Sequence, residues 1–130
     1  GVHYRSPRGV TLARGDLDAT DGRCARVSQA LLTLEAPGRD QFISDRDPQR
    51  PDIEINVGDG SVGTYDVELS LDHGQPFIPV QRGLGGNQAL DLDHLGYHIA
   101  RFIRVSTRQS GGTVCVDSVV VNGRVTGAPP

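Results

Sequence analysis

The stretch Tyr65-Asp-Val-Glu-Leu-Ser-Leu71 decides the fold, because apolar and polar residues alternate along its whole length. Alternation with a period of two separates side chains onto the two faces of a β-strand. The four apolar side chains are therefore expected on one inward face: Tyr65, Val67, Leu69 and Leu71. The turn signal Asp72-His-Gly74 follows, and Pro76-Phe-Ile-Pro-Val80 then predicts an edge strand, because proline cannot donate to a central ladder.

Further strand patterns lie on both sides of this stretch. Ile53-Glu-Ile-Asn-Val57 alternates, with Glu54 and Asn56 expected to face away from the core. The intervening Asp59-Gly60-Ser-Val-Gly63 predicts a hairpin connection. Ile99 to Val105 alternates less and is expected to be a central strand covered on both faces. Val114 to Val121 is an apolar run that predicts the closing strand.

The N-terminal half is less regular. Residues 1–9 resemble an irregular leader, and Val10 to Ala13 predicts a short edge strand. Cys24 to Glu35 reads as a strand, although Val27 to Leu34 also has apolar residues at helical spacing. Residues 36–52 are polar and rich in proline and glycine, which predicts a long loop of the kind that often carries function.

Seven or eight short strands separated by Gly, Asp and Asn turns predict an all-β fold, an antiparallel β-sandwich of the jelly-roll type. The 130 residues suffice for one domain with a buried core. We expect this core over about residues 10–123, followed by a linker-like tail at 124–130 and, overall, a place within a larger protein.

Composition narrows the range of partners. The net charge of −3 gives no basic footprint for nucleic acid, and no apolar run reaches membrane-spanning length, so neither nucleic-acid binding nor membrane insertion is expected. All 13 basic residues are Arg, and 13 of the 16 acidic residues are Asp. Asp is both a common turn residue and a hard oxygen ligand for calcium, so its excess fits either role.

The two cysteines, Cys24 and Cys115, each fall in a strand-like segment, one near the start of the chain and one near its end. First and last strands of a sandwich commonly lie side by side, which places the two thiols for a disulfide and implies an oxidising compartment. The alternative is a pair of buried free thiols.

Several of these segments resemble the galactose-binding-like family of jelly rolls (discoidin, coagulation factor 5/8 C-type), as found in bacterial cell-surface and secreted proteins. Tyr65-Asp-Val-Glu-Leu-Ser-Leu-Asp-His-Gly74 is similar to its "Y-x-V-x-x-S-x-D-G" strand, and Pro76–Val80 to the strand after it. Ala100-Arg-Phe-Ile-Arg-Val105 resembles "A-R-Y-I-R-I", and Asp117-Ser-Val-Val-Val121 the closing "D-A-V-E-V". The Pro37-Gly38 and Asp52 region resembles the "P-G-x-D" entry, here with an insertion.

This resemblance, over about residues 24–121, implies a secreted or surface-attached module that is sugar-binding or adhesive. It also implies a structural calcium ion near the N-terminal loop and the last strand. The closely spaced carboxylates Asp16, Asp18 and Asp21 are the candidate ligands in that loop, and Asp117 lies where related domains supply a ligand from the last strand. The alternative for the loop is a solvated acidic turn.

Two loop segments are candidates for ligand binding. The mixed-charge loop carries Asp45, Asp47 and Asp52. A later segment carries Asp91, Asp93, His94 and His98, and its two histidines are four residues apart. These residues line a binding surface in one interpretation; in the other, the loop is solvated and the histidines are ordinary surface residues.

No catalytic signature is present: the sequence lacks a Gly-x-Ser-x-Gly elbow and a phosphate-cradling glycine loop, and Glu is scarce for a paired-carboxylate glycosidase. We expect a non-enzymatic extracellular module that binds a glycan or a cell-surface protein. The alternatives are a structural or protein-interaction module and a small Asp-based hydrolase. Tyr65 and Phe102 are expected in the core, which leaves few aromatic rings to stack on a sugar.

Overall fold

The computed structural model describes residues 3–5, 13–14, 24–25, 30–36, 38–44, 46–58, 61–96, 98–107 and 114–126. Strands dominate this part of the chain, and the helical content is one 3-10 turn. In chain order the elements are β1 (His3–Arg5), β2 (Ala13–Arg14), β3 (Cys24–Ala25), β4 (Ala30–Glu35), β5 (Phe42–Ser44), β6 (Ile53–Val57), β7 (Tyr65–Ser70), β8 (Ile78–Leu84), β9 (Gln88–Leu90), η1 (Asp93–Leu95), β10 (Ile99–Ala100), β11 (Phe102–Thr107), β12 (Val114–Val121) and β13 (Gly123–Val125). The predicted all-β class is confirmed.

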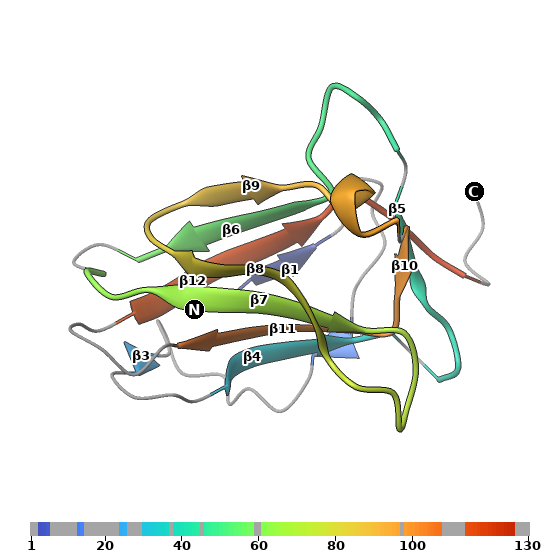
Figure 1. Ribbon diagram of the computed structural model, residues 1–130, viewed down its shortest axis with the longest axis horizontal. Helices are drawn as coiled ribbons and strands as arrows, with labels where there is room; N and C mark the ends of the chain where they lie inside the picture. The colour runs from blue at the N-terminus through green and yellow to red at the C-terminus, as the bar shows by residue number, and fades with distance from the viewer. Residues whose placement is uncertain are drawn as a thin grey trace.

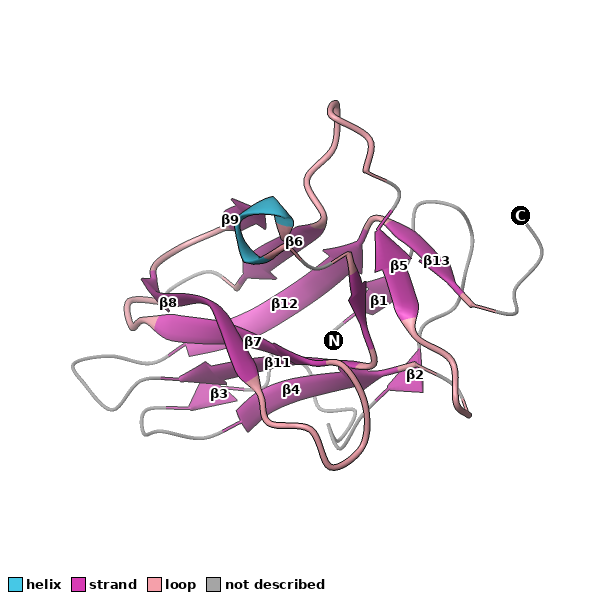
Figure 2. Ribbon diagram, turned by 45° about the vertical axis from the view of Figure 1, so that its right-hand side comes forward, coloured by secondary structure: helices cyan, strands magenta, loops and turns pink. Residues whose placement is uncertain are grey.

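The strands form two larger sheets and one small one. The first larger sheet has the order β1-β12-β6-β9, with β3 also paired to β12, and the second has the order β2-β4-β11-β7-β8. These two sheets lie as layers in a sandwich-like arrangement (Figure 1). The small sheet β10-β5-β13 lies at one end of the layers (Figure 2).

One strand pairing departs from the predicted antiparallel arrangement. β1 pairs with β12 in parallel, with His3 opposite Ser118 and Arg5 opposite Val120, whereas the other pairings are antiparallel. Residues 1–9 therefore include a strand, although they were predicted to be an irregular leader. A strand of three residues is too short to show a hydrophobic period, so no local pattern predicts β1.

The core lies between the two larger sheets. Both sheets contribute strands with alternating burial. Of the four side chains predicted to face inward from Tyr65–Leu71, three are fully buried as predicted, Tyr65, Val67 and Leu69, whereas Leu71 follows the end of β7 and is half-buried against the core. The largest side chains with under 2 % exposure are Tyr65, Leu34, Ile53, Ile55, Leu69, Ile103, Val67, Val105, Val114 and Val116. Each such aliphatic side chain contributes about 1.5 to 3 kcal/mol by leaving water.

The predicted hairpin between Ile53–Val57 and Tyr65–Leu71 is wrong. β6 and β7 belong to different sheets, so the connection crosses from one layer to the other. Its residues extend the β6 edge along β12: the Gly58 N–H donates to the Cys115 carbonyl at 2.7 Å, and the Cys115 N–H donates to Ser61 Oγ at 3.0 Å. A local turn signal indicates a change of direction but does not specify which sheet receives the next strand.

The predicted strand over Ile99–Val105 is divided in two. β10 pairs with β5, whereas β11 lies between β4 and β7. Arg101 separates β10 from β11 in the chain, and its N–H donates to the Ser70 carbonyl at 2.8 Å. β11 is central, as predicted, but its burial alternates and one face remains half-exposed. The expectation of cover on both faces is therefore corrected.

Two boundaries also change. β5 lies inside the predicted loop 36–52. β13 reaches Val125, and the Thr126 N–H donates to the Gln41 carbonyl at 2.9 Å, which corrects the expected linker start at residue 124. The predicted edge strand exists, but it is shifted from Pro76–Val80 to Ile78–Leu84; among the described residues, β8 pairs with β7 alone and ends its sheet. Within the described ranges, no helix has the length and apolar character needed to cross a bilayer.

Candidate functional site

An open cleft of about 510 Å³ lies where the loop between β5 and β6 meets the segment around η1. The loop projects beyond the sheets beside η1 (Figure 1). The lining residues come from both predicted ligand-binding segments: Arg46, Asp47, Pro48, Gln49, Arg50, Pro51, Asp52, Ala89, Asp91 and Asp93. Residues about 40 positions apart in the chain thus contribute to one cavity. We call it the loop cleft.

Asp52 forms the base of the loop cleft. It is only 6 % exposed, and its two carboxylate oxygens serve different segments. Oδ2 accepts a hydrogen bond from the Leu92 N–H at 2.7 Å, and Oδ1 accepts one from the Ser44 hydroxyl. The Asp52 carbonyl accepts from the Asn122 N–H at 2.9 Å. Asp52 therefore joins the loop to η1 and to the end of β12, and its role within the cleft is to hold the walls together.

The loop itself is shaped by Asp47 and by an unusual backbone at Arg46. Asp47 Oδ1 accepts from the Gln49 N–H at 2.9 Å, and Asp47 Oδ2 lies 3.5 Å from Arg50 Nε. Arg46 has a φ of +52°, and it alone among the described residues other than glycine has a positive φ. Its N–H donates to Ser44 Oγ at 3.0 Å. A left-handed conformation costs an arginine roughly 1 to 2 kcal/mol, which the surrounding hydrogen bonds offset.

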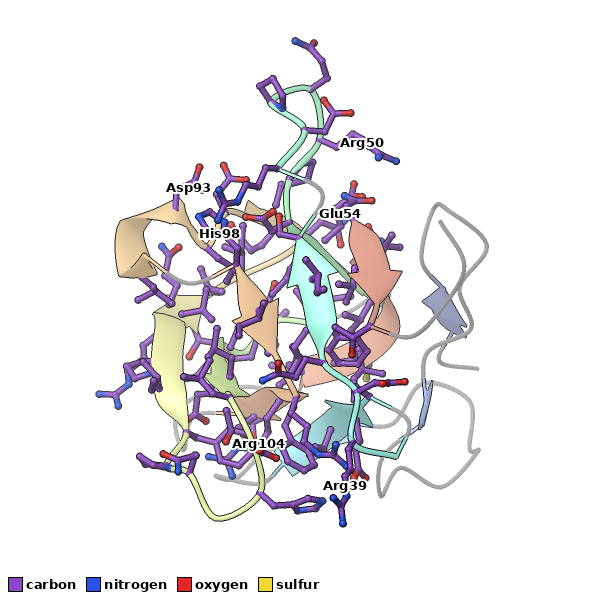
Figure 3. All side chains as sticks on the ribbon, turned by 90° about the vertical axis from the view of Figure 1, so that its right-hand side faces the viewer. Arg39, Arg50, Glu54, Asp93, His98 and Arg104 are labelled. Carbon is purple, nitrogen blue, oxygen red and sulfur yellow. The ribbon has the colours of Figure 1, made fainter. Side chains whose placement is uncertain are left out.

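The opposite wall presents exposed carboxylates. Asp91 and Asp93 are both exposed, and Asp93 Oδ1 lies 3.7 Å from Nδ1 of the mostly buried His98. Figure 3 places Asp93, His98 and Arg50 at the same end of the molecule. His98 Nδ1 has no hydrogen-bond partner among the described residues. His94 belongs to η1, but its side chain lies outside the described part, as does the whole of Asp45.

The loop cleft has an acidic balance. Four carboxylates line it, against the two guanidinium groups of Arg46 and Arg50. Asp91 and Asp93 are free to accept hydrogen bonds from a ligand, because both carboxylates face solvent. This arrangement suits a ligand with many hydroxyl or ammonium donors and disfavours a strongly anionic one.

The predicted calcium ligands lie largely outside the described residues. Asp16, Asp18 and Asp21 are not described, and only the backbone of Asp117 is. That backbone lies at a β-bulge, because the β12–β6 register shifts between Val116 and Ser118. Bulges redirect side chains and often occur beside functional sites. Among the described residues, no group of three or more His, Cys, Asp or Glu side chains could hold a metal ion.

The backbones of the two cysteines lie at directly paired positions of antiparallel strands. The register of β12 and β3 pairs Cys115 with Cys24 directly. Residues paired directly across antiparallel strands have Cα atoms about 4.5 to 5.5 Å apart, which lies within the range of about 4.4 to 6.8 Å for disulfides.

Sequence reasoning missed a second cavity, on the outer face of the sheet that contains β11. Phe102 was expected in the core, but it is half-exposed on the same face as Arg104, because Ile103 and Val105 are the buried residues of β11. The cavity measures about 360 Å³ and includes Phe77 of the β7–β8 connection. The charge of Arg104, two residues after Phe102, was the available signal that Phe102 faces outward.

The chain was compared with protein-family models, with curated proteins and with solved structures, and none of the three comparisons gave a match.

Proposed function

We propose that this chain is a non-catalytic extracellular binding module that holds a glycan in the loop cleft. The observation that carries the proposal is convergence: two loops of high polarity, remote in sequence, line one open cavity and are tied together by Asp52. A cavity of about 510 Å³ lies within the usual range of about 300 to 1,000 Å³ for small-molecule sites. Rigid strands supporting functional loops are a common arrangement in binding proteins.

The chemistry of the walls favours a neutral or amine-bearing sugar. Carboxylates such as Asp91 and Asp93 accept hydrogen bonds from vicinal hydroxyls, while Arg46 and Arg50 supply donors. The excess of carboxylates repels sulfated and sialylated glycans. In this proposal Asp47 and Asp52 shape the cleft, because their carboxylates accept hydrogen bonds from the Gln49 N–H, the Leu92 N–H and the Ser44 hydroxyl.

The setting of the proposal is a galactose-binding-like jelly roll at the cell surface or in a secreted protein. Successive strands pass between the two larger sheets, from β6 to β7 and β8, back to β9, and then from β11 to β12, as in jelly-roll topologies. A disulfide between Cys24 and Cys115 belongs to the same proposal, and their register supports it. Disulfides persist in oxidising compartments, which agrees with an extracellular location.

A structural calcium ion is part of the proposed module, held by Asp16, Asp18 and Asp21 with help from Asp117. Its test is a thermal melt with calcium and with a chelator. Because a bound ion stabilises only the folded state, chelation lowers the melting temperature if the ion is present. The same melting temperature under both conditions removes calcium from the proposal.

The experiment for glycan binding is an array screen of the purified chain in calcium and in chelator. Selective signal on neutral or amino sugars, with none on sialylated or sulfated ones, is the expected result. Silence in both conditions from a folded sample contradicts the glycan proposal and favours a structural or protein-interaction module. Hydrolysis of an arrayed sugar contradicts the non-catalytic assignment.

A further inference from the structure

The outer face of the sheet β4–β11–β7–β8 carries a second pocket, distinct from the loop cleft. We call it the sheet-face pocket; its volume is about 360 Å³. Figure 3 shows Arg104 of this pocket low on the molecule and Arg50 of the loop cleft at the top. Two aromatic rings line the pocket: Phe102, which points outward from β11, and Phe77, with ring centroids 6.3 Å apart.

Both rings are held in place by neighbours in the folded chain. The guanidinium carbon of Arg104 lies 3.7 Å from the centroid of the Phe77 ring. Glu68 fixes that guanidinium by two hydrogen bonds, Nε to Oε1 at 3.3 Å and Nη2 to Oε2 at 3.1 Å. His73 meets Phe102 edge-on, with centroids 5.0 Å apart. Because folding has already ordered these side chains, a ligand that stacks on them loses little further entropy.

The charged groups of the pocket are largely paired with one another. Arg104 is paired with Glu68, and the buried Arg101 behind Phe102 donates to Glu35 at 3.1 Å. The guanidinium of Arg104 lies over the Phe77 ring and that of Arg101 over the Phe102 ring, so a ligand is left with the ring surface that these two groups do not cover, and with a polar rim. Asp72 and Gln75 are exposed on this rim. Asp72 Oδ1 accepts from the His73 N–H at 2.7 Å and lies 3.9 Å from Arg101 Nε, so Oδ2 is the oxygen of Asp72 that can accept from a ligand, while Gln75 offers both donor and acceptor.

We propose that the sheet-face pocket binds a neutral pyranose, with the apolar C–H face of the sugar against the aromatic rings and its hydroxyls on the rim. A peptide strand fits less well. β11 is paired on both sides, with β4 and β7, so its backbone has no groups left for β-augmentation. The proposal does not rest on the loop cleft, and it gives the module a second point of contact with a polysaccharide.

The test is an NMR titration of the isotope-labelled chain with methyl β-galactopyranoside, methyl β-glucopyranoside and N-acetylglucosamine. Each sugar is taken to about ten times a Kd of about 1 mM. At least one sugar is expected to shift the signals of His73, Phe77 and Phe102 together. Phe102→Leu, which keeps an apolar side chain, weakens that response by about tenfold, because it removes the stacking surface.

Three controls make the result specific. Val62→Leu changes an exposed apolar residue elsewhere (75 % exposed) and leaves the response intact. Asp91→Asn changes only the loop cleft and also leaves it intact, so the two proposals fail independently. If Phe102→Leu is not folded, Asp72→Asn at the rim replaces it, with a weaker response expected.

Three outcomes overturn the sheet-face proposal. The first is the absence of shifts at these three residues with every sugar. The second is a response that both Phe102→Leu and Asp72→Asn leave unchanged. The third is a response to N-acetylphenylalaninamide and to none of the sugars, because it identifies a site for peptide side chains.

Discussion

The carboxylate of Asp52 accepts a hydrogen bond from the backbone N–H of Leu92 at 2.7 Å, 40 residues along the chain. This contact joins the loop between β5 and β6 to the segment that enters η1. The other oxygen of Asp52 accepts from the Ser44 hydroxyl, which in turn accepts from the Arg46 N–H. The walls of the loop cleft therefore depend on one buried carboxylate.

Replacement of Asp52 is expected to destabilise the fold. Asp52→Ala leaves the Leu92 N–H and the Ser44 hydroxyl without their acceptor, which costs about 2 to 4 kcal/mol of unfolding free energy. Asp91→Ala, on the exposed wall of the same cleft, is the matched control and changes stability by less than about 0.5 kcal/mol. Urea denaturation of both variants measures the difference. Equal stability of the two variants contradicts the role given to Asp52.

Gly123 is expected to tolerate no side chain. A Cβ added there lies 1.9 Å from the Ile43 carbonyl oxygen, because β13 and β5 approach closely at this point. Gly123→Ala therefore destabilises by about 3 kcal/mol through overpacking. Gly85→Ala is the matched control, since a Cβ there meets nothing within 4 Å. Thermal melts measure the melting temperatures of both variants, and equal values contradict this close β5–β13 contact.

Reduction is expected to destabilise the chain if Cys24 and Cys115 form the proposed disulfide. A cross-link over so long a loop stabilises by roughly 4 to 5 kcal/mol in the chain-entropy model. Mass spectrometry after alkylation, with and without reductant, detects the bond, and the Cys115→Ser variant gives the loss of stability without reductant. Alkylation of both thiols in the folded, unreduced chain rules the disulfide out.

Tyr65 is expected to make stability fall at high pH. Burial raises the pKa of its hydroxyl well above the usual range, and the hydroxyl donates to the Gly86 carbonyl at 2.7 Å. Above pH about 10 the unfolded state loses this proton more readily than the folded state, so the stabilisation is full below that pH and declines above it.

The comparison for this prediction is Tyr65→Phe. At neutral pH the variant is less stable by about 1 kcal/mol, because one hydrogen bond is lost. Above pH about 10 its stability should fall less steeply than that of the parent chain. Denaturation measured across this pH range gives both slopes, and parallel slopes argue against a buried, protonated Tyr65.

The sequence predicts those strands whose hydrophobic period is long enough to read. β6 and β12 have the predicted boundaries, Ile53–Val57 and Val114–Val121, because alternation or a continuous apolar run marks each of them. β5 has three residues in a polar loop and exists through pairing with β10 and β13, which are remote in sequence. No local pattern encodes such a strand.

The candidate sites show the same division between local and tertiary information. Asp47, Asp52, Asp91 and Asp93 were predicted from local polarity, and the fold brings them to one cleft. That Asp52 is buried depends on its partner Leu92, which the sequence does not reveal. Phe102 faces outward because the alternation of inward and outward side chains is interrupted at Arg101, where β10 ends and β11 begins in another sheet.

The measurement that most directly tests the central claim is isothermal titration calorimetry of a glycan from the array against three proteins: the parent chain, Asp91→Asn and Val62→Leu. Asp91 is an exposed carboxylate that lines the loop cleft, whereas Val62 is 75 % exposed and lines neither the loop cleft nor the sheet-face pocket. Because hydrogen bonds to charged groups are worth about 1.5 to 3 kcal/mol, the account predicts at least about tenfold weaker binding for Asp91→Asn and unchanged binding for Val62→Leu. Equal affinity of the parent chain and Asp91→Asn would contradict it.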